Sequence, residues 1–138
     1  SGSSGNSLYA GCDGGHLLMD AGVSCARIVA ELRKIGISPA QLSGVLVTHE
    51  HIDHIRGVGV LSRKYDLPVF ATEGTWAAME DKLGGVAMKN MRVLEPMEDF
   101  YLGGMNITAF DIPHDAARLS CCLFLFRRTR AGRPAFVA

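Results

Sequence analysis

The chain has 138 residues, of which 48% are hydrophobic and 20% charged, a composition typical of one globular domain and not of a disordered or fibrous chain. Its 14 basic and 14 acidic residues cancel, so no long-range field draws it toward nucleic acid or an anionic membrane, although a locally basic groove is compatible with this balance. There is no apolar run of about eighteen residues and no charged-then-apolar leader, so we expect a soluble protein with no membrane partner.

The cysteines indicate the redox compartment. The 4 cysteines form no C-x-x-C pair; they are Cys12, Cys25, Cys121 and Cys122. The last two are adjacent and would point to opposite faces of a strand. This arrangement favours free thiols in a reducing cytoplasm over a disulfide framework.

In chain order, the first predicted elements are two strands, LYA and HLLMD, joined by the glycine-rich turn GCDGG. Ser24 is a good N-cap for a helix that Gly36 ends, and the apolar side of this helix carries Ile28, Val29, Leu32 and Ile35. The next segment, GVLVT, is short, apolar and rich in valine, as expected of a strand covered on both faces.

The middle of the chain continues the alternation of helix and strand. IRGVGVLSRKYD is expected to be helical despite its two glycines, and LPVFA to be a strand. A helix is predicted from Thr75 to Leu83, with Glu73, Glu80 and Asp81 on its exposed side. The last part differs, because FYLGGMNITAF predicts a hairpin and SCCLFLFRR and RPAFVA predict further strands. Together these segments predict an α/β (α+β) domain with a mixed sheet covered by helices.

A group of polar residues follows the predicted buried strand in VLVTHEHIDHIR. Open α/β sheets place ligand sites at the carboxyl ends of their strands. In an extended stretch His49 and His51 point to the same side, and Asp53 and His54 come at the start of the next helix. Imidazole and carboxylate groups are ligands that suit zinc, manganese or iron. The spacing therefore predicts a metal site.

The alternative interpretation is a polar loop whose histidines are solvated or hydrogen-bonded, and we interpret His16 in that way because it stands alone. Three imidazoles as close as those of the cluster would repel one another when protonated, and a bound cation removes this difficulty. A catalytic metal takes three protein ligands and leaves one position for water, so a histidine from elsewhere is expected. His114, at the end of a β-rich run, is the candidate.

The segment VTHEHIDHIRGVGVL resembles the H-x-H-x-D-H motif of the metallo-β-lactamase superfamily, and LLMDAG resembles the acidic motif that ends an earlier strand in that family. SGSSGNS, LLMDAGVSC, LPVFATEGTW and PHDA add a looser resemblance to its YycJ/WalJ branch, a group of bacterial hydrolases related to nucleases. The resemblance covers nearly the whole chain. It also matches SGSSGNS to a native glycine/serine loop of the branch, whereas the segment alone could equally be a linker.

This resemblance implies an αββα sandwich with a two-metal site, occupied by zinc or manganese, in a groove at one edge. His49, His51 and His114 would hold the first cation, and Asp53 and His54 would hold part of the second. Asp53 would also act in catalysis by holding the water or accepting its proton. The implied reaction is hydrolysis of a phosphodiester, above all DNA, by a metal-activated hydroxide.

The same resemblance gives Asp20 a role in orienting a ligand, whereas its sequence context is equally that of a turn acid at a strand end. Members of the branch carry a bridging aspartate and a further histidine in a region that this chain does not include. We therefore expect residues 1–138 to be an incomplete metallo-β-lactamase-like domain, lacking its first strand and C-terminal half. Such a chain would hold one cation tightly and associate through uncovered strands such as CCLFLF.

Two other functions stay open. The same fold hydrolyses thioesters or lactams when a small apolar pocket is present. A non-catalytic truncated remnant is the second alternative, and the genomic reading frame beyond Ala138 would distinguish it from a fragment of a longer protein.

Overall fold

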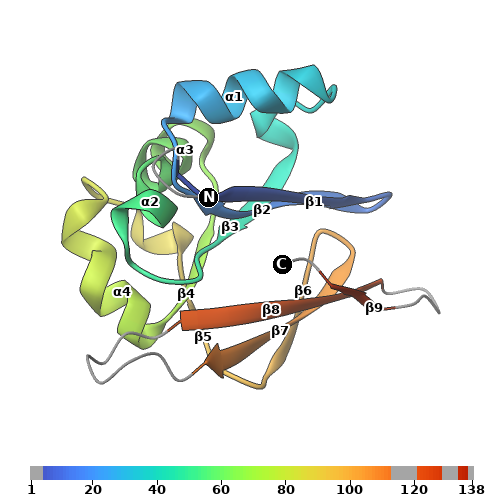
Figure 1. Ribbon diagram of the computed structural model, residues 1–138, viewed down its shortest axis with the longest axis vertical. Helices are drawn as coiled ribbons and strands as arrows, with labels where there is room; N and C mark the ends of the chain where they lie inside the picture. Colours follow the sequence, from blue (N-terminus) through green and yellow to red (C-terminus); the bar gives the residue numbers. More distant parts are fainter. Residues whose placement is uncertain (1–4, 113–120, 129–133, 137–138) are drawn as a thin grey trace.

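Two β-sheets stacked face to face form the centre of the computed structural model, which describes residues 5–112, 121–128 and 134–136 (Figure 1). The first sheet has the order β1 (Ser7–Cys12), β2 (Gly15–Ala21), β3 (Leu42–Leu46), β4 (Val69–Thr72) and β5 (Met91–Leu94). Its first pair is antiparallel and the other pairs are parallel. The second sheet is antiparallel, in the order β6 (Asp99–Leu102), β7 (Met105–Ile112), β8 (Cys121–Arg128) and β9 (Pro134–Phe136).

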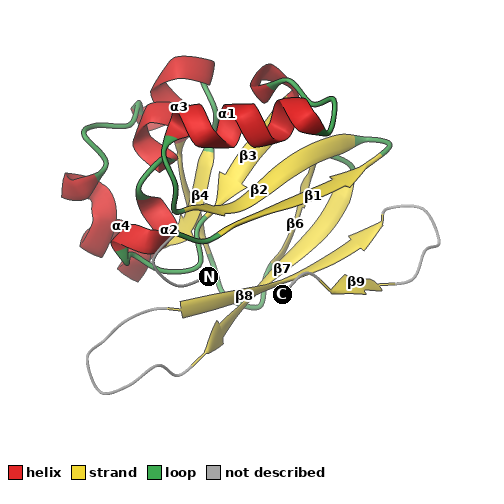
Figure 2. Ribbon diagram, turned by 45° about the horizontal axis from the view of Figure 1, so that its top comes forward, coloured by secondary structure: helices red, strands yellow, loops and turns green. Residues whose placement is uncertain are grey.

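The helices gather on the side of the first sheet that faces away from the second (Figure 2). They are α1 (Cys25–Lys34), α2 (Ile52–Ile55), α3 (Val58–Tyr65) and α4 (Glu73–Met79), with short 3₁₀ turns at Pro39–Gln41, Glu80–Lys82 and Met88–Asn90. Within the described residues no helix has the length and apolar character needed to span a bilayer. The observed arrangement confirms the sandwich fold, with one of its helical layers present among these residues.

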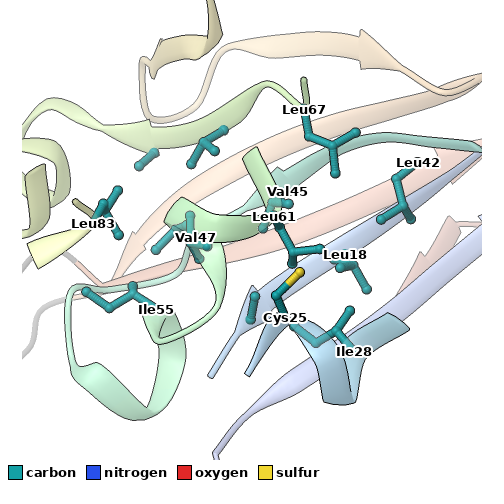
Figure 3. Packing of buried hydrophobic residues seen from close by; sticks show 14 of the residues in the cluster. Leu18, Cys25, Ile28, Leu42, Val45, Val47, Ile55, Leu61, Leu67 and Leu83 are labelled. Carbon is teal, nitrogen blue, oxygen red and sulfur yellow. The ribbon is translucent and has the colours of Figure 1, made fainter. Parts of the chain in front are cut away.

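The hydrophobic core consists of two clusters on opposite faces of the first sheet. The cluster between this sheet and the helices includes Leu18, Ile28, Val45 and Leu61 (Figure 3). The cluster between the two sheets joins side chains of both: Leu17, Met19, Leu46, Leu94, Met105, Ile107, Ala109, Phe124 and Phe126. Strand β3 contributes to both clusters, since Val45 and Leu46 point to opposite faces of the sheet. The prediction of a strand covered on both faces is therefore confirmed.

Several local predictions required correction. The segment predicted as one helix from Ile55 to Asp66 is divided between α2 and α3. The division falls at Gly57, whose N–H donates to the carbonyl of Ala21 at 2.7 Å and where a Cβ would lie 2.4 Å from the carbonyl oxygen of Val23. This close approach leaves no room for a side chain at position 57. The glycine therefore allows the chain to change direction there and to pack against the end of β2.

Further differences concern the start of α4, the end of α1 and the strands. Helix α4 begins at Glu73, not Thr75, because the hydroxyl of Thr72 caps it by accepting from the N–H of Thr75. Ile35 is 54% exposed since it follows the last turn of α1, whereas the other predicted apolar positions of that helix are buried. Strand β5 was not predicted from the sequence. The first sheet is the predicted mixed sheet covered by helices, and the later strands form a second, antiparallel sheet.

Candidate metal centre

Strand β3 positions the candidate site at its carboxyl end. It lies between β2 and β4 in parallel register, with Met19 beside Leu46. The chain continues past buried Val47 to the loop that carries the histidines, and His51 precedes the first turn of α2. Because β2 ends next to β3, the register places Asp20 beside this loop. The two predicted motifs, far apart in sequence, therefore meet at one edge of the sheet.

Asp20 is 4% exposed and connects the two strand ends. One carboxylate oxygen accepts the N–H of Thr48 at 2.8 Å, and the other accepts the Thr48 hydroxyl at 2.7 Å. The second oxygen also lies 2.7 Å from Nδ1 of His54. A carboxylate only accepts hydrogen bonds, so Nδ1 carries the hydrogen and Nε2 is left as the basic nitrogen. Asp20 thus fixes both the orientation and the tautomer of His54.

The surroundings of His49 and His54 shift their pKa values in opposite directions. Burial lowers the pKa of His49, and the adjacent imidazoles of His54 and His51 lower it further. Burial also acts to lower the pKa of His54, but the hydrogen bond and charge of Asp20, together with the charge of Asp53, raise it above the ordinary value. His49 is therefore kept neutral, which is the form of histidine that binds a cation.

Asn6 connects a second segment to the site. Its N–H donates to the carbonyl of Asp53 at 2.7 Å, and its own carbonyl accepts the N–H of Gly22 at the same distance. The side-chain amide donates to Oδ2 of Asp53 at 3.1 Å and lies 3.1 Å from Nε2 of His54. The same Oδ2 is 3.6 Å from that nitrogen. Asn6 therefore holds the carboxylate of Asp53 and the basic nitrogen of His54 side by side.

The imidazoles of the cluster pack against one another. The ring centroids of His49 and His51 are 4.6 Å apart, and those of His49 and His54 are 3.8 Å apart. Within the described part of the chain, no three His, Cys, Asp or Glu side chains form a ready-made metal site. His114, the expected third ligand of the first cation, lies outside the described residues.

The donor set nevertheless suits a divalent cation. Imidazoles and a carboxylate lie together on one loop, and a carboxylate behind His54 supplies the support that metal-bound histidines usually have. His51, 50% exposed at its side chain, is accessible from solvent. The assignment of His49, His51, Asp53 and His54 as ligands stays a prediction that this chemistry supports.

Three polar residues of the site were not identified from the sequence. Thr48 ties the loop to Asp20, and Asn6 aligns Asp53 with His54. Glu50 is 3% exposed, with Oε1 4.0 Å from Nε2 of His51. For Glu50 the sequence did contain a signal, because this acid stands between two histidines of the motif. Asn6 had no such signal, because its contacts lie 47 residues away.

The role of Asp20 can be tested with Asp20→Asn. We expect the affinity for zinc to fall about 10- to 100-fold, because the amide keeps the size of the side chain but loses the charge that fixes His54. Zinc titration against a competing chelator would measure this change, and nitrogen NMR of the imidazoles would show a mixed tautomer at His54. Asp66→Asn is the matched control, since both aspartates have positive φ, 61° and 53°. Equal zinc affinity in the two variants would contradict the orienting role.

The family profile and two similar relatives point to the same protein family. The sequence profile described as "Metallo-beta-lactamase superfamily" matches residues 2–123. The chain is 44% identical over 117 residues to a Bacillus anthracis protein named Exodeoxyribonuclease YycJ, which covers 85% of this chain and 44% of that relative. It is also 44% identical over 118 residues to Exodeoxyribonuclease WalJ of Streptococcus pneumoniae, covering 84% of this chain and 44% of that relative.

Solved structures agree at the level of the fold. MEM-A1, a subclass B3 metallo-beta-lactamase from a soil metagenome library, superposes with a TM-score of 0.73 at 23% identity, over 94% of this chain and 53% of that one. A second, Rm3 metallo-beta-lactamase, has a TM-score of 0.73 at 23% identity and covers 93% of this chain. At this identity the likeness shows the fold alone. The chain spans less than half the length of the two exodeoxyribonucleases that it resembles.

Proposed function

The chain belongs to the metallo-beta-lactamase superfamily, and we propose that it acts as a metal-dependent phosphodiesterase, specifically an exonuclease on DNA. The observation that carries this proposal is the 44% identity, over 85% of the chain, to a relative named an exodeoxyribonuclease. The site supports it, because the H-x-H-x-D-H residues meet at one sheet edge with Asp20 behind them. The activity proposed is that of the whole protein to which these residues belong.

In this proposal His49 and His51, with His114, hold one cation, and Asp53 and His54 contribute to a second. When bound, such cations lower the pKa of a water molecule and stabilise negative charge on the attacked phosphate. Asp53 accepts the proton of the attacking water. Its carboxylate is suited to this step because Asn6 holds Oδ2 in place and the Asp53 side chain is 43% exposed to solvent.

We further propose zinc or manganese as the metal, with one ion held tightly by residues 1–138. Imidazole and carboxylate ligands suit both metals.

A cytoplasmic location, in a bacterium like those of the relatives, is supported by the free thiols of Cys12 and Cys25. Self-association is also proposed. The segment CCLFLF does not carry it, because Phe124 and Phe126 are buried between the sheets, whereas Tyr101 and Val93 are exposed apolar side chains on strands. Sedimentation at two protein concentrations would detect it.

A substrate panel tests the proposed reaction. The purified whole protein that contains residues 1–138, supplied with zinc or manganese, is incubated with end-labelled single- and double-stranded DNA, a chromogenic β-lactam and a thioester. We expect DNA to be shortened progressively from one end, with little hydrolysis of the other two substrates. Faster hydrolysis of the lactam or the thioester would favour the alternative reaction. Binding of metal without hydrolysis of any substrate would favour a non-catalytic domain.

A further inference from the structure

A polar cavity of about 250 Å³ opens beside the candidate metal centre. Its walls are formed by Gly5, Gly22, Val23, Ser24, Arg27, Asp53 and Arg56. Asp53 belongs both to the wall of this cavity and to the histidine cluster, so the cavity lies beside the candidate metal centre. Since a water molecule occupies about 30 Å³ of liquid, the cavity has room for a phosphate group with its oxygens. Its position suits a group next to the one that reacts.

Two guanidinium groups give the cavity its charge. Arg27 lies in the first turn of α1 and Arg56 directly after α2, and both residues are exposed. Among the described residues neither forms an ion pair with a carboxylate. Glu31, one turn after Arg27, is instead paired with Lys34 at 2.9 Å. The cavity therefore has two cationic side chains and one carboxylate, that of Asp53, and neither arginine is ion-paired with that carboxylate in the described structure.

The other parts of the cavity wall are backbone atoms, an apolar side chain, or polar side chains that already have hydrogen-bond partners. Gly22 packs so closely that a Cβ would lie 1.6 Å from the carbonyl oxygen of Asp53, which keeps this side free of side chains. The carboxylate of Asp53 is turned toward Asn6 and His54. Val23 and Ser24 form the turn that begins α1, and the dipole of that helix adds to the attraction of the arginines for an anion.

We propose that this cavity binds a phosphate group of a polynucleotide strand, adjacent to the phosphodiester that is hydrolysed, through Arg27 and Arg56. The planar guanidinium matches phosphate oxygens in pairs, so two arginines that line one cavity favour a phosphate over a carboxamide or a neutral sugar. The identity of the strand rests on the proposed function. The site would also supply the locally basic groove that a chain of zero net charge needs for this substrate.

Binding can be tested without hydrolysis. The whole chain is kept metal-free with a chelator, and the affinity for a labelled single-stranded oligonucleotide is measured by fluorescence anisotropy at several salt concentrations. We expect Arg27→Gln and Arg56→Gln each to weaken binding about tenfold and to reduce the slope of log K against log salt by about 0.7, the value for one phosphate contact on a single strand. Both side chains are exposed, so both variants should fold, which circular dichroism would check.

Arg33→Gln is the matched control, because this arginine is exposed in the last turn of the same helix and does not line the cavity. It should bind the oligonucleotide like the unchanged chain. If Arg27→Gln and Arg56→Gln also bind like the unchanged chain, the cavity is not a phosphate site. Since no bond is cleaved in this assay, failure of the whole protein to degrade DNA would contradict the proposed function and leave the binding result standing.

A second comparison identifies which phosphate is bound. The oligonucleotide is prepared with a 5′-phosphate and with a 5′-hydroxyl. If the loss of affinity in Arg27→Gln is confined to the phosphorylated strand, the cavity takes a terminal phosphate. If the loss is equal for both strands, it takes an internal phosphodiester. No loss for either strand overturns the proposal.

Discussion

We expect His51→Ala to remove the tightly held metal ion and to lower DNA hydrolysis about a thousandfold, equivalent to about 4 kcal/mol of activation free energy. The physical reason is that His51, the most exposed histidine of the cluster, is one of the proposed metal ligands. Because the side chain is 50% exposed, its removal should leave the fold intact. Elemental analysis of the purified variant gives the metal content, and release of nucleotides from end-labelled DNA gives the rate.

His16→Gln is the control for His51→Ala. His16 is hydrogen-bonded to the hydroxyl of Tyr9 on the neighbouring strand, as expected for the isolated histidine of the sequence, and glutamine can keep such a contact. This variant should retain both metal and activity. If His51→Ala retained its metal and activity as His16→Gln does, His51 would not be a ligand.

Gly22→Ala should cause the largest loss of stability among single substitutions near the site, about 3 kcal/mol or more in the free energy of unfolding. An added Cβ would lie 1.6 Å from the carbonyl oxygen of Asp53 and 2.6 Å from the backbone nitrogen of Asn6. Neither contact involves a flexible side chain, so the backbone itself must move. Urea denaturation followed by circular dichroism would measure the change.

Gly36→Ala separates this steric effect from the cost of an unusual backbone conformation. Gly36 has a φ of 76° and no atom within 4 Å of an added Cβ, so its substitution should cost only about 1 kcal/mol. A smaller loss for Gly22→Ala than for Gly36→Ala would mean that the contact between Gly22 and Asp53 is loose in solution.

The local elements of the fold were predictable because their signals are local. Ser24 marked the start of α1, and the two glycines at 103 and 104 marked the hairpin of β6 and β7. Strand β5 gave no such signal, since Arg92 and Val93 are exposed at the edge of the sheet and its sequence lacks alternation. The division of the strands into two sheets depends on which strands pair, and residue periodicity does not contain that information.

The candidate site shows the same limit. The convergence of His49, His51 and His54 followed from their spacing after a buried strand. For Asp20, sequence left a turn acid and an orienting group equally open, and the register of β2 beside β3 decided that it lies against His54. Asn6 contacts Asp53 because two segments 47 residues apart in sequence lie side by side, and no local pattern encodes that proximity.

Strand β3 links the interior of the sandwich to the geometry of the site. Val45 and Leu46 face different cores, and the loop that follows carries the histidines. A one-residue insertion in this strand would exchange the faces of its side chains and advance the following loop by about 3.3 Å. Evolution therefore cannot adjust the length of β3 gradually, because each step would disturb both cores and misplace the imidazoles together. Changes in length are more readily accommodated in exposed connections, such as the one between α4 and β5.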